Sequence, residues 1–193
     1  TAGNTGSSGT TANFTIDTTA PTAAITYTGG SSPYLAGETV KITATFNGPV
    51  LDSPVPTIAI AGSGIANVTS TNMARTSTTV YTYSYSVPTG DGTGTVTVGT
   101  GTDAAGNIVT ATPTSGATFT VDNTAPSLTQ VTAVVTPSNN TTPSYVFTTG
   151  EAGTITSSLS FSSTTSATTG SNQTITFSTL SEGTYSPTVT VTD

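Results

Sequence analysis

Hydrophobic and polar side chains alternate along almost every segment of this chain. In residues 40–46 a hydrophobic side chain occupies every second position, and lysine or threonine fills the positions between. This period of two is the pattern of a β-strand with one buried face. The alternation recurs in residues 57–60, 81–87, 95–98, 119–121, 145–147, 175–177 and 189–191. Because Gly, Pro, Asn and Ser separate these segments and no helical period occurs, the sequence predicts an all-β fold.

The expected strands fall into two groups, each preceded by a short proline-containing linker. The linkers are Thr18-Thr-Ala-Pro21 and Asn123-Thr-Ala-Pro126, and proline favours extended backbone at such junctions. Domain one is predicted at residues 18–122, with strands near 22–28, 38–46, 56–61, 65–71, 78–87, 94–100 and 117–122. Domain two is predicted at residues 123–193, with strands near 127–135, 142–149, 154–161, 173–178 and 185–192. The strand number of domain one is that of an immunoglobulin-type β-sandwich.

One stretch of sequence occurs twice if the end of the chain is read into its beginning. Asp103-Ala-Ala-Gly-Asn107 leads to Phe119-Thr-Val-Asp122, and Asp193 followed by Thr1-Ala-Gly-Asn4 leads to Phe14-Thr-Ile-Asp17. We therefore expect one period of a tandem array, in which residues 1–17 form the final strand of a preceding domain. Domain two then lacks its last strand. The equivalent of residues 1–17 would supply it from the next repeat, or from another molecule in an isolated chain.

The composition excludes several classes of function. Lys41 and Arg75 are the only basic residues and the net charge is −7, which excludes neutralisation of nucleic-acid phosphates and binding to anionic membrane surfaces. No apolar run approaches the ~20 residues that span a bilayer. The absence of His and Cys removes the usual zinc ligands and the Ser-His and Cys-His nucleophile pairs. We therefore predict that the chain is not an enzyme.

Acidic residues gather near the expected junctions. In an immunoglobulin-type sandwich the chain enters beside the loops that follow the second and sixth strands. For domain one this groups Asp17 and Asp103 with Asn47 or Asp52, and for domain two it groups Asp122, Glu151 and Asp193. Ca²⁺ takes roughly 6–8 oxygen ligands, so one interpretation is calcium at these junctions. The other interpretation is that Asp and Asn cap tight turns through bonds to the main chain.

Two further motifs each have a structural and a functional interpretation. Tyr81, Tyr83 and Tyr85 share one face of an expected strand and could stack on a sugar, but Val87 continues this face and favours core packing. Gly90-Asp-Gly-Thr-Gly94 has glycines like a phosphate-binding loop. It lacks the lysine and the following helix of such loops, so we predict a hairpin turn.

Several of these segments together resemble a known family. The linkers FTIDTTAP and FTVDNTAP, the loop TDAAGN at 102–107 and the run at 79–98 are similar to the bacterial Ig-like tandem repeats of giant surface adhesins, biofilm proteins and surface-layer proteins. The resemblance covers essentially the whole chain. It implies tandem immunoglobulin-like β-sandwiches in an exported, cell-surface array, often with calcium at the domain junctions, and it implies no particular ligand.

The predicted function is that of a structural repeat unit in a long extracellular protein, such as an adhesin stalk, a surface layer or a filament. Its expected partners are neighbouring repeats or identical chains in a fibre or lattice, because the edges of its sheets lack the lysines that usually block pairing. The alternative is an Ig-like module that binds a glycan or a partner protein on an open face. The acidic groups and the linker prolines of this chain fall at the expected junctions between domains. This placement favours the structural interpretation.

Overall fold

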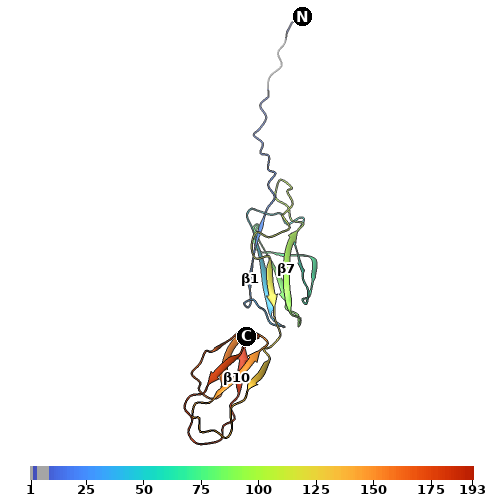
Figure 1. Ribbon diagram of the computed structural model, residues 1–193. Helices are drawn as coiled ribbons and strands as arrows, with labels where there is room; N and C mark the ends of the chain where they lie inside the picture. Colours follow the sequence, from blue (N-terminus) through green and yellow to red (C-terminus); the bar gives the residue numbers. More distant parts are fainter. Residues whose placement is uncertain (1, 4–8) are drawn as a thin grey trace. The chain divides into compact units, whose positions relative to one another are not determined.

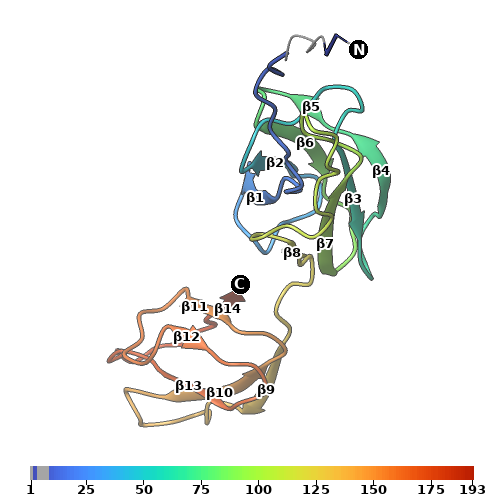
Figure 2. The same ribbon diagram turned by 90° about the horizontal axis from the view of Figure 1, so that it is seen from above.

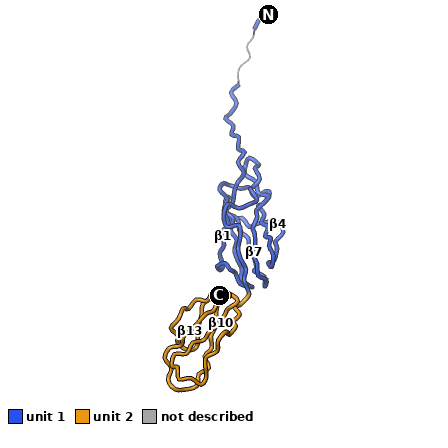
Figure 3. The backbone as a smooth tube through the Cα atoms, in the orientation of Figure 1, with its two compact units in different colours: residues 1–123 blue, residues 124–193 orange. Residues whose placement is uncertain are grey.

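In the computed structural model, which describes residues 2–3 and 9–193, the chain divides into two compact units (Figures 1 and 3). Unit 1 comprises Thr1–Asn123 and unit 2 comprises Thr124–Asp193. Both units consist of antiparallel sheets, and the described residues contain no helix, so the prediction of an all-β fold is confirmed. Accordingly, no described segment forms a helix that is long and apolar enough to cross a membrane.

Unit 1 contains two four-stranded sheets (Figure 2). The first has the order β1 (Ala23–Thr28), β2 (Thr39–Phe46), β6 (Val80–Ser86) and β5 (Ala74–Arg75). The second has the order β4 (Val68–Asn72), β3 (Thr57–Ala61), β7 (Gly92–Gly99) and β8 (Thr118–Val121). Strands that follow one another in sequence thus often lie in different sheets.

One hydrophobic core joins the two sheets of unit 1. In β2 the residues at every second position are buried and Lys41 between them is exposed, as the alternation predicts. The core contains 19 buried residues drawn from both sheets. Tyr81 and Tyr85 are among them, and half-buried Tyr83 packs against them, so the prediction that these tyrosines pack in the core is confirmed.

Unit 2 contains two three-stranded sheets around a smaller core. One sheet has the order β13 (Gln173–Thr176), β10 (Ser144–Thr149) and β9 (Leu128–Thr132), and the other has the order β12 (Ser166–Ala167), β11 (Gly153–Ser157) and β14 (Val189–Thr192). The buried hydrophobic residues of this unit are Phe147, Ile155, Ala167, Ile175, Phe177 and Val191.

The observed strands differ from the predicted ones where side chains or proline end the pairing. The strand expected from residue 65 begins at Val68, because Asn67 Oδ1 accepts a hydrogen bond of 2.9 Å from Gly62 N and closes a turn. The strand expected from residue 185 begins at Val189, two residues after Pro187, which has no N–H to donate. The two-residue strands β5 and β12 are too short to show a period of two.

The predicted hairpin turn at residues 90–94 is wrong. The strands on either side of it, β6 and β7, lie in different sheets, so this loop carries the chain from one sheet to the other. Its glycines allow this loop to come into close contact with the loop at Ser63 and Gly64.

The segment before unit 1's sandwich does not pair with any strand among the described residues. Residues 9–17 carry no strand assignment, and the side chains of Phe14 and Ile16 are 81% and 78% exposed. The remainder of the strand predicted at residues 1–17 includes Thr1 and residues 4–8, which lie outside the described part of the chain.

Candidate functional site: the two ends of unit 1

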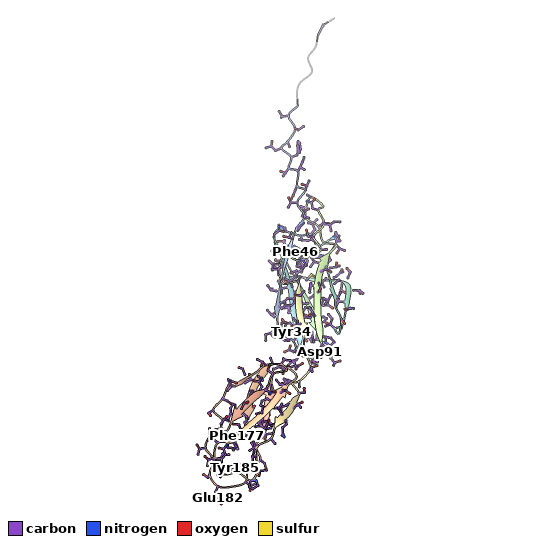
Figure 4. All side chains as sticks on the ribbon, viewed as in Figure 1. Tyr34, Phe46, Asp91, Phe177, Glu182 and Tyr185 are labelled. Atoms are coloured by element: carbon purple, nitrogen blue, oxygen red, sulfur yellow. The ribbon has the colours of Figure 1, made fainter. Side chains whose placement is uncertain are left out.

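The chain enters unit 1 at one end of its sandwich and leaves at the other (Figure 1). In the pairing of β1 with β2, Ala23 lies opposite Phe46 and Thr28 lies opposite Lys41. The loop after Phe46 therefore lies beside the entering chain, and the loop after Thr28 lies at the exit. Figure 4 labels Phe46 near the entry end of unit 1, and Tyr34 and Asp91 near its exit end.

At the entry end, Asp103 closes the loop in which it lies. Its Oδ1 accepts hydrogen bonds from the main-chain N–H groups of Ala105 and Asn107, each at 2.9 Å. Its Oδ2 accepts a bond of 2.9 Å from Asn107 Nδ2. The hydrogen bond from the Asn107 side chain is the largest cause that lowers the pKa of the Asp103 carboxyl. Desolvation opposes it, and the main-chain donors lower the pKa further. Asp103 therefore acts as the capping residue of a tight turn.

Two asparagines of unit 1 hold the entering chain. Asn107 Nδ2, already bonded to Asp103, also donates to the carbonyl oxygen of Asp17 at 3.2 Å. Asn47 Oδ1 accepts a bond of 2.9 Å from Thr22 N. The carboxylate of Asp17 accepts a bond of 2.9 Å from Thr19 N, two residues further along. The structure thus brings Asp17 and Asp103 together through the amide of Asn107, and these bonds are those of the turn-capping interpretation.

The other acidic residues of the predicted calcium groups have different surroundings. Asp52 faces Arg75 across 3.8 Å, and both side chains are roughly half exposed, so this ion pair adds little stability. Asp122 belongs to unit 1, whereas Glu151 and Asp193 belong to unit 2. Within the described residues, no three His, Cys, Asp or Glu side chains form a group that could hold a metal ion. Calcium at the junctions stays a prediction.

At the exit end, Asn123 ties three segments of unit 1 together. Its Nδ2 donates to the carbonyl oxygens of Gly90 and Pro88 at 2.7 and 3.3 Å. Its Oδ1 accepts a bond of 2.5 Å from Ala36 N, and its own N–H donates to Asp91 Oδ1. Sequence reasoning identified Asn123 only as part of a linker. The one signal in the sequence was that the other linker has a threonine, Thr18, at the position of Asn123.

Glycines bring the loop that contains Gly90 and Asp91 into place. A Cβ added at Gly64 would collide with the carbonyl oxygen of Asp91, and one added at Gly92 would collide with that of Ser63. The two loops therefore touch backbone to backbone, which only glycine permits at these positions. This contact fixes the oxygens that receive the bonds of Asn123.

We expect Asn123→Ala to lower the free energy of unfolding of unit 1 by about 1–3 kcal/mol. The change leaves the part-buried Gly90 carbonyl without the partner that it has in the native chain, and an unmade bond at such a group costs about this much. Urea unfolding of the full chain, followed by tyrosine fluorescence, measures the loss.

Asn139→Ala, at an exposed asparagine of unit 2, is the matched control and should leave the unfolding midpoint of unit 1 unchanged. Asn123→Asp should also destabilise unit 1, because its carboxylate cannot donate to the carbonyl oxygens of Gly90 and Pro88 and is repelled by them. Equal midpoints for Asn123→Ala and Asn139→Ala would show that Asn123 does not hold the exit.

Comparisons with protein-family models, with curated proteins and with solved structures gave no match in any of the three. The two clamped ends of unit 1 and the exposed edges of the sheets are the features of the molecule that bear on its function.

Proposed function

We propose that this chain is a structural repeat unit of a long extracellular protein in which immunoglobulin-like β-sandwiches follow one another end to end. The strand orders of unit 1 support the immunoglobulin-like assignment. The order β1-β2-β6-β5 corresponds to the ABED sheet of such a domain, and β3-β7-β8, with β4 added at one edge, corresponds to the CFG sheet.

The observation that carries the proposal is that the chain passes through unit 1 from end to end and is held by asparagine at both ends. Asn107 and Asn47 bind the entering chain, and Asn123 binds the exit loops. A pull on the two linkers is therefore transmitted through the whole sandwich. A link in an array needs this property, whereas a domain that only presents a binding face does not.

The first strand and the segment before the last strand of unit 1 run parallel and bond directly. Ile25 N donates to Ser115 O at 3.0 Å, and Thr114 N donates to Ala23 O at 2.7 Å. The Tyr27 hydroxyl donates to Gly116 O at 2.5 Å. Burial, and to a smaller extent the nearby Tyr34, raises the pKa of Tyr27 to about 12, so the hydroxyl remains a donor at neutral pH. Pulling the two ends apart loads these bonds together in shear.

The alternative, a glycan-binding module, has less support. Two of the three tyrosines that could form a stacking platform, Tyr81 and Tyr85, are at most 2% exposed. The low content of charged residues, 6%, and the absence of His and Cys fit a hydroxyl-rich spacer in an extracellular, cell-surface setting.

Single-molecule force spectroscopy tests the proposed function. The chain has no cysteine, so a pair can be introduced as handles. With handles at Thr18 and Thr124, unit 1 should unfold at a clearly higher force than with handles at Ser63 and Thr124. Both residues of the second pair lie at the exit end, and pulling them peels strands one bond at a time. An equal or lower force in the end-to-end geometry would contradict a load-bearing role.

The same instrument tests calcium at the junctions. In two linked copies of the chain, added Ca²⁺ should stiffen the junction that contains Asp122, Glu151 and Asp193, because a cation removes the repulsion among carboxylates. Identical traces with Ca²⁺ and with chelator would favour the turn-capping interpretation.

A further inference from the structure

One six-residue motif occurs in two different states in this chain. Residues 117–122 read Ala-Thr-Phe-Thr-Val-Asp and residues 12–17 read Ala-Asn-Phe-Thr-Ile-Asp. In the first copy, Phe119 and Val121 are 4% and 2% exposed. In the second copy, Phe14 and Ile16 are 81% and 78% exposed. The second copy therefore has the side chains of an inner strand without a sheet to cover them.

In unit 1 the first copy of the motif covers the edge of β7. Phe119 lies opposite Gly94, and Val96 N donates to Ala117 O at 2.7 Å. The ring of Phe119 enters the core, where its centroid lies 5.4 Å from that of Tyr85 and 5.6 Å from that of Tyr27. The motif thus supplies both main-chain pairing and a core aromatic ring.

Unit 2 has an equivalent edge. Residues 188–191 at β14 repeat the Thr-Val-Thr-Val sequence of residues 95–98 in β7. β14 pairs with β11 on one side and is the edge of its sheet on the other. The N–H and the carbonyl of Thr188 both bond to Ser158, on the β11 side. Because successive residues of a strand point their main-chain groups to opposite sides, Val189 and Val191 present theirs to the edge.

A cavity lies beside this edge. It has a volume of about 310 Å³ and is lined by Gln130, Val134, Tyr145, Phe177, Pro187 and Val189. Pro187 precedes Val189 by two residues, as Gly94 precedes Val96 in the strand that Phe119 covers. The cavity therefore lies where unit 1 places the ring of Phe119. The core of unit 2 is smaller than that of unit 1, as expected if no aromatic ring fills this position.

We propose that residues 184–189, the edge that leads into β14, bind residues 12–17 of a second copy of this chain as an antiparallel strand, in the register that β8 has on β7. Ala12 then lies opposite Val189, and Phe14 enters the cavity opposite Pro187. Since Pro187 has no N–H, the donor beside it is Val189, whose N–H faces the carbonyl of Ala12 as the N–H of Val96 faces that of Ala117 in unit 1. Addition of a strand to an open edge is an established mode of recognition. This proposal rests on the proposed function, because it specifies how one unit joins the next.

The geometry of the contact is heterologous: each copy gives its residues 12–17 and receives another copy at residues 184–189. Such contacts do not pair two copies face to face but continue into rings or filaments. The association should therefore be open-ended, and the mean size of the assemblies should rise with protein concentration.

The register can be tested with a pair of cysteines, because the native chain has none. Thr118 lies opposite Thr95 in unit 1, which corresponds to Asn13 opposite Thr188 in the proposed contact. This pair lies next to the bonded pair of Val96 and Ala117, so its Cα atoms should be about 4.5 Å apart, within the range of a disulfide. Both Asn13 and Thr188 are exposed, so the substitutions should not disturb folding.

Mild oxidation of Asn13→Cys/Thr188→Cys should give a ladder of disulfide-linked oligomers on a non-reducing gel. Thr15→Cys/Thr188→Cys, which shifts the first cysteine by two residues, should give much less. Equal cross-linking by the two pairs, or none by the first, would overturn the proposed register and with it the proposal.

Sedimentation of cysteine-free chains provides a second test. Phe14→Asp should abolish the concentration-dependent assembly, and Ile108→Asp, which changes a residue of unit 1 that is 64% exposed, should leave it intact. A chain that carries a second copy of residues 1–17 after Asp193 should fill its own edge and remain a monomer with a more heat-stable unit 2.

A native chain that remains a monomer at high concentration, or an extended chain that assembles as readily as the native one, would overturn the proposal. The force measurement with handles at Thr18 and Thr124 does not involve β14. Failure of strand addition is therefore distinguishable from failure of the proposed load-bearing function.

Discussion

Phe119→Ala is expected to lower the free energy of unfolding of unit 1 by about 3–5 kcal/mol, the usual cost of removing a buried phenylalanine ring. The ring packs against three tyrosines, with centroid distances of 5.6 Å to Tyr27, 6.1 Å to Tyr34 and 5.4 Å to Tyr85. Its loss would leave a cavity between the two sheets that these rigid side chains cannot fill. The unfolding midpoint in urea, followed by tyrosine fluorescence, measures the effect.

Phe14→Ala is the matched control, because it makes the same chemical change in the same sequence motif. In dilute solution it should leave the stability of both units unchanged, since Phe14 is 81% exposed in the isolated chain. A similar loss for the two variants would mean that Phe14 also packs within its own chain, and the interpretation of the motif's two states would then be wrong.

Gly64→Ala is expected to destabilise unit 1 by about 2–5 kcal/mol. The φ angle of Gly64 is 73°, and the left-handed region costs a residue with a Cβ about 1–2 kcal/mol. In addition, the new Cβ would collide with the carbonyl oxygen of Asp91, which belongs to main chain and cannot turn aside. Overpacking of this kind costs typically 1–3 kcal/mol.

Gly37→Ala separates the two contributions. Gly37 also has a positive φ, 86°, but no atom lies within 4 Å of an added Cβ. Gly37→Ala should therefore destabilise unit 1 only by the cost of a left-handed backbone, about 1–2 kcal/mol. Urea unfolding of both variants gives the difference, and chemical shifts of the Asn123 side-chain amide should move in Gly64→Ala alone. Equal losses would mean that the contact between the two loops adds no constraint.

The alternation of hydrophobic residues predicted the longer strands that line the two cores, but it did not predict the two-residue strands β5 and β12. In β2, each position predicted to face the core is buried, because burial of one face is what produces a period of two. The assignment of strands to sheets could not be predicted in this way. Gly90-Asp-Gly is compatible with a turn between paired strands and with a loop between two sheets, and the choice depends on contacts with Ser63 and Gly64, distant in sequence.

The candidate site was predicted in part. The sequence placed Asp17 and Asp103 together at the entry of unit 1, and the structure joins them through Asn107. It did not identify the role of Asn123, which bonds to Ala36, a residue 87 positions earlier. An asparagine in a linker has the same local pattern whether it caps its own turn or binds a distant loop, so this role becomes visible only in three dimensions.

The positions of the two basic residues affect how proteases can attack the chain. Lys41 lies in β2, between β1 and β6, and Arg75 lies in β5, paired with β6. Proteases of trypsin type cut after lysine or arginine and need several residues of extended, unpaired substrate around the cut. Unit 2 has neither residue, and both residues of unit 1 are held in the same sheet. Cleavage by such enzymes is therefore coupled to the opening of that sheet, and its rate in solution reports how often the sheet opens.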